Sequence, residues 1–237
     1  MRGYGQFCPV AAAAAIVAER WTPLVVRELL CGSRRFNDIH RGVPLMSRTL
    51  LATRLAELEE AGVIRREVGP DGRGTYRLTE QGEALRPVVE ALGEWGLRFS
   101  QPTVQEDSLD AALLMWDLRR KIRVQVSPPR RVVIHFELEG VRPRDRRRTR
   151  WWVIARPDDE VDLCLKDPGF EVDLVVVADL AALTRLWLWR LGWREAVRAG
   201  SVRVEGARAL VHALPSWLPV PLVTPAEPPR FVVAAAR

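Results

Sequence analysis

Hydrophobic residues in the first part of the chain recur at the spacing of α-helices. Unbroken patterns cover Val10–Arg20 and Thr22–Leu30, and a glycine closely follows the second of them. A short helix around Ile39 is predicted next, with Ser33 or Asn37 as its cap, because either side chain can accept a backbone hydrogen bond. The chain is therefore expected to begin with three helices in succession.

A longer helix with a well-defined apolar face follows. Leu51, Leu55 and Leu58 are three or four residues apart, so they share one side of a helix. Ser47 is the predicted cap at its start, and Gly62 lies where a helix of this length would stop. The opposite face of this helix is therefore expected to be exposed.

The next residues predict a hairpin and then a long helix. Two short strands, 63–68 and 75–78, flank a glycine-rich tip. Thr79 is the predicted cap of a helix that runs to about Phe99, and Pro87 is a residue type that kinks helices. One stripe of this helix is apolar and consists of Leu85, Val88, Val89, Leu92, Trp95 and Phe99.

This order of elements predicts a winged helix-turn-helix, a fold that places one helix in the major groove of DNA. The helix that begins at Ser47 takes that place, and its N-terminus can bind a phosphate. Arg48 can bind a guanine edge, and Thr49 and Thr53 can contact thymine methyl groups or phosphates. The alternative for each arginine is a solvated surface charge. The candidate DNA-contacting residues are Arg34 and Arg35 as phosphate clamps, Ser47, Arg48, Thr49, Thr53, and Arg73 at the tip of the wing.

The second half of the chain has a different pattern. We expect a domain over residues 1–100, a linker over 101–107 and a second domain over 108–237. A basic run, Arg142–Arg150, can touch DNA beside an operator or form a solvated hairpin tip. The predicted elements are a helix over 109–122, strands over 131–139, 151–155, 161–165 and 172–177, helices over 179–191 and 193–198, a strand at 202–204, a helix over 207–213 and an irregular tail from Pro215.

Composition agrees with a globular DNA-binding protein. The 237 residues are 48% hydrophobic and 28% charged, and the formal net charge of +6 suffices for phosphate contact if the arginines share a face. Three cysteines without CxxC spacing do not form a disulfide framework and indicate a reducing cytoplasm.

The apolar run Val10–Ala18 has a second interpretation as a secretory signal. It is rich in alanine, Arg2 is the one basic residue before it, and Glu19 and Arg20 follow at once, all of which argue against export. No run reaches the roughly 18 apolar residues that a membrane-spanning helix needs. We therefore expect a cytoplasmic protein without membrane contact.

Six motifs follow one another in unbroken order over about residues 6–100: Cys8-Pro9-Val10, Arg20-Trp21-Thr22, Arg27-Glu28-Leu29-Leu30, Arg35-Phe36-Asn37-Asp38-Ile39, the stretch from Leu55 to Ile64, and Tyr76-Arg77-Leu78-Thr79. Together they resemble the HxlR family of winged-helix regulators. The resemblance implies a cytoplasmic homodimer whose first and last helices pack across a two-fold axis. Such a dimer presents its recognition helices about 34–36 Å apart, so its partner is double-stranded DNA with a palindromic operator.

Cys8 lies where many family members carry a cysteine, which some use as a redox or electrophile sensor. Pro9 can serve as the first-turn residue of the first predicted helix, so Cys8 directly precedes that helix, and a helix N-terminus favours the reactive thiolate. The alternative is a small, half-buried residue without a sensing role.

A second set of residues lies mainly within 172–214: Val172 to Val177, Asp179 to Leu183, Leu188, Arg190 to Trp193, Ala196, Gly200, Val202, Val204 to Gly206 and Leu210. Through them, the region from about 108 to 218 resembles the sterol-carrier-protein-like fold. The resemblance implies a curved sheet with helices over one face that encloses an apolar tunnel for lipids or similar ligands. The fold class of the whole chain is thus α+β, with a winged helix-turn-helix followed by an α/β sterol-carrier-protein-like domain.

Seven of the nine tryptophans lie beyond residue 115 and suit the wall of an apolar pocket. The candidate pocket residues are Trp116, Trp152, Trp187 and Trp189, and the alternative for each is ordinary core packing. Trp187 and Trp189 are two residues apart on a predicted helix, so they cannot both face one direction.

No enzyme chemistry is evident in the sequence. His40, His135 and His212 are isolated and lack metal-ligand spacing to the cysteines, and GxSxG, Walker and GxGxxG motifs are absent. We therefore expect no catalytic residues, metal or cofactor.

Three hypotheses follow. In the first, the protein is a regulator, expected to be a repressor, whose operator binding responds to a hydrophobic small molecule in the C-terminal domain. In the second, Cys8 senses oxidants and the C-terminal domain is structural. In the third, the protein is an apolar-ligand carrier or enzyme whose winged helix is an interaction module.

Overall fold

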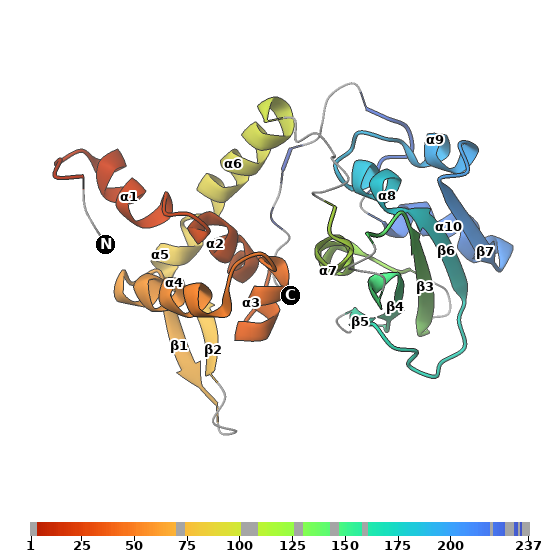
Figure 1. Ribbon diagram of the computed structural model, residues 1–237, viewed down its shortest axis with the longest axis horizontal. Coiled ribbons are helices and arrows are strands. Elements are labelled where there is room, and N and C mark those ends of the chain that lie inside the picture. Colours follow the sequence, from red (N-terminus) through yellow and green to blue (C-terminus); the bar gives the residue numbers. More distant parts are fainter. Residues whose placement is uncertain are drawn as a thin grey trace. The chain divides into compact units, whose positions relative to one another are not determined.

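The computed structural model divides the chain into two compact units, which are described separately (Figure 1). The winged-helix unit comprises Met1–Gly96 and Phe231–Arg237, and the C-terminal unit comprises Leu97–Arg230. The sequence assigned residues 231–237 to the second domain, whereas the structure groups them with the first. Arg73 and the expected linker lie outside the described residues, which are 4–69, 74–100, 109–125, 130–142, 147–157, 161–218, 220–225, 230–231 and 233.

The winged-helix unit opens with the helices that the sequence predicted. The bounds of the second agree at both ends, whereas the first ends at Val17, three residues earlier than expected. Neither predicted cap of the third helix is used, because the helix begins at Phe36 and its N-cap residue is Arg35. Ser33 donates to Glu28 instead, and Asn37 lies inside the helix and accepts from Arg48. The four helices are α1 (Pro9–Val17), α2 (Thr22–Leu30), α3 (Phe36–Gly42) and α4 (Arg48–Glu60).

A two-stranded antiparallel wing follows α4 and projects from the helices (Figure 1). Its strands are β1 (Ile64–Val68) and β2 (Gly74–Leu78), with Ile64 opposite Leu78. Thr79 caps the next helix as predicted, since its hydroxyl accepts from the Gly82 amide at 3.2 Å.

The long helix predicted after the wing is divided in two. α5 (Glu80–Glu83) ends before Leu85, and α6 (Arg86–Phe99) begins one residue ahead of Pro87. Proline has no amide proton for the hydrogen bond that would continue α5, which explains the break. The core of this unit is formed by buried side chains of α2, α3, α4 and the wing: Val25, Val26, Leu29, Leu30, Ile39, Leu51, Leu55, Leu58, Ile64 and Leu78, with Val89 and Val233.

The C-terminal unit is built on one five-stranded sheet with the order β5-β4-β3-β6-β7. β3 and β6 run parallel, and the other neighbouring pairs are antiparallel. The elements are α7 (Ala111–Lys121), β3 (Val132–Glu139), β4 (Arg150–Ala155), β5 (Asp162–Cys164), β6 (Leu174–Asp179), α8 (Leu180–Trp187), α9 (Trp193–Arg198), β7 (Val202–Gly206) and α10 (Arg208–Trp217).

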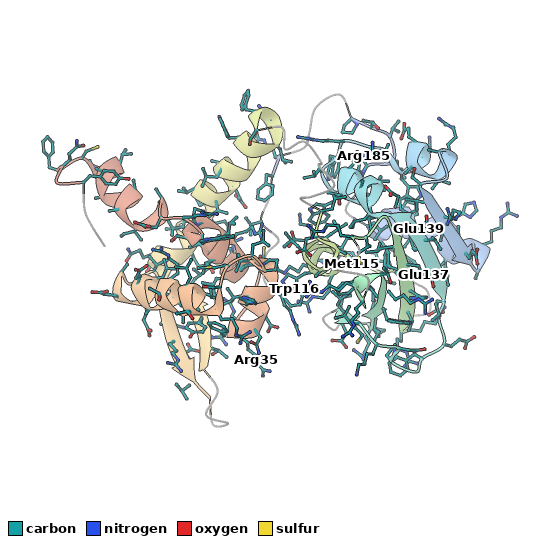
Figure 2. The ribbon with its side chains drawn as sticks, in the orientation of Figure 1. Arg35, Met115, Trp116, Glu137, Glu139 and Arg185 are labelled. Carbon is teal, nitrogen blue, oxygen red and sulfur yellow. The ribbon has the colours of Figure 1, made fainter. Side chains whose placement is uncertain are left out.

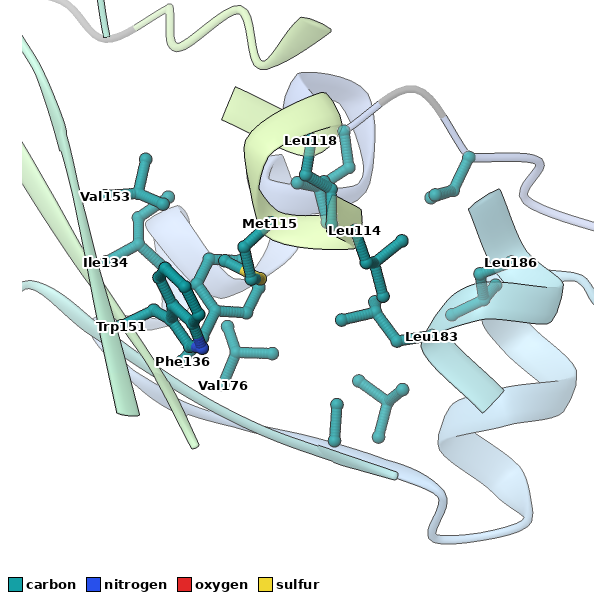
Figure 3. Packing of buried hydrophobic residues seen from close by; sticks show 14 of the residues in the cluster. Leu114, Met115, Leu118, Ile134, Phe136, Trp151, Val153, Val176, Leu183 and Leu186 are labelled. Atoms are coloured by element: carbon teal, nitrogen blue, oxygen red, sulfur yellow. The ribbon is translucent and has the colours of Figure 1, made fainter. Parts of the chain in front are cut away.

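Alternation along the strands divides the apolar side chains between the two faces of the sheet. On one face, Phe136 and Val176 pack against Met115 of α7 and Leu183 of α8 to form the main core (Figure 3). On the other face, a smaller cluster contains Val133, Trp152 and Ile154, with Cys164, Phe170 and Val172 packed against it.

Two predicted helix ends in this unit are wrong. α8 stops at Trp187 rather than at residue 191, and Trp189 has a φ of 57°, which a continuing helix excludes. α10 runs through Pro215, where the sequence predicted an irregular tail, because burial of Leu214 and Trp217 offsets the hydrogen bond that proline removes. In the basic run Arg142–Arg150, residues 143–146 lie outside the described part of the chain.

In the part of the chain that the structure describes, no single helix has the length and apolar character needed to cross a bilayer. The pair Pro9–Val17 and Thr22–Leu30 meets that test jointly, but it is bent by 79°.

Candidate nucleic-acid interface

α4 has one buried face and one exposed face, as the leucine spacing predicted. Leu51, Leu55 and Leu58 are at most 2% exposed. The predicted contact residues lie on the other side, and all of them are exposed: Ser47, Arg48, Thr49 and Thr53. The Ser47 hydroxyl accepts from the Leu50 amide at 3.2 Å and so fixes the start of the helix.

The Arg48 side chain is held in place by α3. Its Nη2 donates to Oδ1 of Asn37 at 2.7 Å, and its Cζ lies 5.0 Å from the centre of the Phe36 ring. A guanidinium carries five N–H donors, so the bond to Asn37 leaves others for a base edge or a phosphate. The sequence did not indicate that Asn37 and Phe36 orient Arg48, because the contact joins two helices.

Thr53 offers less hydrogen bonding than its exposure suggests. Its hydroxyl donates to the Thr49 carbonyl at 3.1 Å, the bond that a threonine commonly makes to the preceding turn of a helix. The hydroxyl proton is therefore engaged, and the methyl group and oxygen lone pairs face outward.

Arg34 and Arg35 lie where α3 meets the wing. The Tyr76 amide donates to the Arg34 carbonyl at 2.8 Å, and Arg35 forms a bridge with Thr75. The Arg34 guanidinium is half-buried and donates to the Leu29 carbonyl at 3.4 Å; burial, and then the charge of Arg77, lower its pKa. Arg35 is exposed near the wing (Figure 2). Its position suits a phosphate contact better than that of Arg34.

The wing carries a charge cluster that the sequence analysis missed. Glu67 accepts from Arg65 Nε at 2.9 Å and from Arg77 Nε at 2.7 Å. The hydrogen bond from Arg65 is the main cause that lowers the pKa of Glu67. Arg65 and Arg77 are cross-strand partners. The cluster could not be predicted from the sequence because the register of the two strands was not known.

A buried network holds α2 and α3 together beneath the interface. The Glu28 carboxylate is fully buried and accepts from Arg27 Nη2 at 2.8 Å, and Arg27 Nη2 also donates to the Gly42 carbonyl at 3.1 Å. The His40 Nε2 lies 2.9 Å from the Met46 carbonyl, so it donates across the turn between α3 and α4. These bonds set the direction in which α4 presents its exposed face.

Cys8 is the N-cap residue of α1 and is partly exposed. Its carbonyl accepts from the Ala12 amide at 3.0 Å, and α1 begins at Pro9 as predicted. The structure thus places the thiol at the helix start that the sensor hypothesis requires.

Two of the four candidate pocket tryptophans, Trp152 and Trp187, lie on opposite faces of the sheet, and Trp189 follows the end of α8 and is partly exposed. Trp152 belongs to the smaller cluster and stacks on His135, with ring centres 4.5 Å apart. Trp187 packs against the main core on the other face, and Lys121 Nζ lies 4.1 Å from the centre of its ring. Trp116 is covered by Arg119, whose Cζ lies 4.1 Å from the ring centre. Among the described residues, no group of three histidine, cysteine or acidic side chains is placed to hold a metal ion.

The exposed α4, its brace on α3 and the antiparallel wing define a winged helix-turn-helix transcriptional regulator. A family model described as HxlR-like helix-turn-helix matches residues 16–104. The transcriptional regulator YvaP of Bacillus subtilis is 38% identical over 101 residues, which is 41% of this chain and 94% of YvaP. YodB of the same organism is 35% identical over 98 residues, 40% of this chain and 88% of YodB. The chain belongs to the HxlR family, and the family match ends at residue 104.

Solved structures of the same class are similar to the chain. Reduced YodB from B. subtilis is 34% identical, with a TM-score of 0.36, and the alignment covers 41% of this chain and 98% of YodB. The redox regulator HypR in its oxidised form is 33% identical, with a TM-score of 0.36, and the alignment covers 38% of this chain and 94% of HypR.

Proposed function

We propose that this HxlR-family regulator acts as a repressor that places α4 in the major groove of its operator. The observation that carries the proposal is the exposed face of α4, whose Arg48 is already oriented by Asn37. In the complex, Ser47 and Arg35 contact phosphates, Arg48 reads a guanine, and Thr49 and Thr53 contact thymine methyl groups or phosphates. Arg34 and Arg73 remain proposed backbone and minor-groove contacts.

We further propose that two copies bind a palindromic operator as a homodimer. The apolar stripe of α6 supports this, since Val88, Leu92, Trp95 and Phe99 are 44–67% exposed within one chain. Burial of such a stripe against its two-fold copy removes apolar surface from water, at about 25 cal/mol per Å².

We propose a hydrophobic small molecule as the effector, bound by the C-terminal unit. The support is the resemblance of this region to the sterol-carrier-protein-like fold, together with its single sheet covered on one face by α7 and α8. A coupling of about 1–3 kcal/mol between effector and operator is enough to switch a promoter. Native mass spectrometry of freshly purified protein would detect a retained ligand directly.

Selection of bound fragments from random duplex DNA, followed by gel shifts, tests the regulator proposal. We expect a palindromic site bound at least a thousandfold more tightly than random DNA at moderate salt. Equal affinity for selected and random sequences would overturn the proposal. Neutralisation of Arg48 and Arg73 should abolish binding; if phenotype and ligand binding survive that change, the interaction-module hypothesis is correct instead.

Cys8 supports a second candidate function, a redox-sensing regulator in which the C-terminal unit is structural. The partly exposed thiol at the start of α1 is the observation behind it. Operator binding is measured before and after oxidation for the native protein and for Cys8→Ser. An oxidant response that survives in Cys8→Ser rules this function out.

A further inference from the structure

The end of the chain contributes to the core of the winged-helix unit. Val233 is 3% exposed and belongs to the same buried cluster as Val89, and Phe231 packs against that cluster. These two residues, which we call the tail anchor, follow every element of the C-terminal unit in sequence. The winged-helix fold of this protein is therefore completed by a segment more than 130 residues after α6.

One face of α6 is shaped to hold the tail anchor. The Val233 amide donates to Glu90 Oε1 at 3.1 Å, and the Val233 carbonyl accepts from Arg86 Nη1 at 3.5 Å. A Cβ built on Gly93 would lie 2.2 Å from Cδ1 of Phe231, so the ring rests where α6 has no side chain. Arg86, Glu90 and Gly93 are four and three residues apart and thus share a face.

The exposed stripe of α6 lies on a different side of the helix. At 100° per residue, Leu92 and Trp95 point about half a turn away from Glu90. The tail anchor thus packs on one side of α6, while the stripe of the proposed dimer contact on the other side remains 44–67% exposed. A shift of α6 would consequently move the stripe and change the spacing of the two recognition helices.

The chain just before the tail anchor is bound within the C-terminal unit. The Trp193 and Arg194 amides donate to the carbonyls of Pro221 and Leu222 at 2.7 and 3.1 Å, and the Gly192 amide donates to the Thr224 hydroxyl at 2.7 Å. From Thr224 to Phe231 an extended chain spans at most about 25 Å. Only six residues separate Thr224 from Phe231 in the sequence, so binding of residues 221–224 and docking of the anchor are linked through a short stretch of chain.

We propose that the tail anchor is an intramolecular ligand of α6 through which the C-terminal unit controls the winged-helix unit. An event that displaces residues 221–224 from the start of α9 weakens docking of the anchor and releases α6. The consequence for operator binding rests on the proposed function, whereas docking of the anchor and its dependence on residues 221–224 do not.

Docking is tested with two glycine substitutions in the same helix. Gly93→Ala puts a methyl group into the Phe231 ring, whereas nothing lies within 4 Å of a Cβ at Gly96. Hydrogen exchange of the Val233 amide is measured in the full chain without DNA. In the native protein and in Gly96→Ala it should be at least tenfold slower than exchange of the same amide in an unstructured chain. Gly93→Ala should lose that protection. An unprotected Val233 amide in the native protein, or equal exchange in the two variants, overturns the proposal.

Control by the C-terminal unit is tested from its own side. A Cβ at Gly192 would lie 1.9 Å from Glu195 Oε2 of α9 and 2.5 Å from the Thr224 amide nitrogen of the tail. Thr224→Val removes the acceptor for the Gly192 amide without touching α9. Both Gly192→Ala and Thr224→Val should accelerate exchange of the Val233 amide at least threefold. Val176→Ala, which makes a cavity in the sheet core and removes none of the hydrogen bonds of residues 221–224, is the control for general destabilisation. Two results would refute the proposal that the C-terminal unit controls docking of the anchor. One is that Val176→Ala accelerates exchange as much as Thr224→Val does. The other is that neither Gly192→Ala nor Thr224→Val accelerates it.

Discussion

Arg48 on α4 and Asn37 on α3 are joined by a 2.7 Å hydrogen bond between Nη2 and Oδ1. The bond spans the helix-turn-helix, so the residue proposed to read a base is oriented before DNA arrives. Preorganisation of this kind reduces the side-chain entropy lost on binding, by about 0.5–1.5 kcal/mol for a long side chain.

Arg48→Ala is therefore expected to weaken operator binding by about 5- to 150-fold, which corresponds to about 1–3 kcal/mol for one base contact. Asn37→Ala should weaken it by about 2- to 10-fold, because the contact remains but its orientation is lost. Fluorescence anisotropy with operator and scrambled duplexes measures both effects. Arg203→Ala in the C-terminal unit is the control and should bind as the native protein does; a loss equal to that of Arg48→Ala would show that any surface arginine has this effect.

Glu67 pairs with two wing arginines and offsets one of their two positive charges, so its removal should strengthen binding to any DNA. Glu67→Gln keeps the shape of the side chain but releases the charges of Arg65 and Arg77 for phosphates. The slope of log affinity against log salt should steepen by roughly 1–2, since each neutralised phosphate adds about 0.9. Titrations at several salt concentrations give this slope, and an unchanged slope would mean that the wing does not approach the duplex.

Gly42 is required because the buried carboxylate of Glu28 occupies the space of a side chain. A Cβ at Gly42 would lie 1.9 Å from the Glu28 carboxyl carbon. Gly42→Ala should lower the free energy of unfolding by about 1–3 kcal/mol or more, the usual range for overpacking. Urea unfolding measures the loss. Gly96→Ala is the matched control, expected to raise stability by up to about 1 kcal/mol through helix propensity; similar values for the two variants would contradict the crowding argument.

His135 makes the stability of the protein depend on pH. Burial against Trp152 lowers the pKa of His135 below its ordinary value of 6.5, and Arg150 acts in the same direction, whereas Glu137 and Asp167 oppose the shift. The unfolded chain then takes up a proton at a higher pH than the folded chain does. The stability contribution is complete above pH 6.5 and is lost as the pH falls below that value.

Unfolding midpoints followed by tryptophan fluorescence between pH 7.5 and pH 5 test this dependence, with those pH limits set around the 6.5 reference value. The native protein should lose stability toward pH 5, and His135→Gln should flatten that part of the curve. His212→Gln is the control, since His212 is exposed at α10. A slope that persists in His135→Gln would assign the pH dependence to another group.

Local patterns were enough to predict most elements of the winged-helix unit and the outward face of α4. Leu51, Leu55 and Leu58 are one turn apart, and Ser47 and Thr79 cap the helices for which they were chosen. These features depend on residues close in sequence, so helical periodicity and capping chemistry reveal them. The break before Pro87 was indicated by the same kind of local rule.

The sequence by itself determined the family, the order of the helices and the wing, and the exposed residues of α4. Only the tertiary structure decided that Asn37 holds Arg48, that Glu67 lies between two arginines, that Trp152 and Trp187 occupy different faces of the sheet, and that Val233, with Phe231 packed beside it, belongs to the winged-helix core. The physical reason is the same in each case. Strand register and contacts between distant segments depend on how whole elements pack, and neither periodicity nor spacing along the chain records that packing.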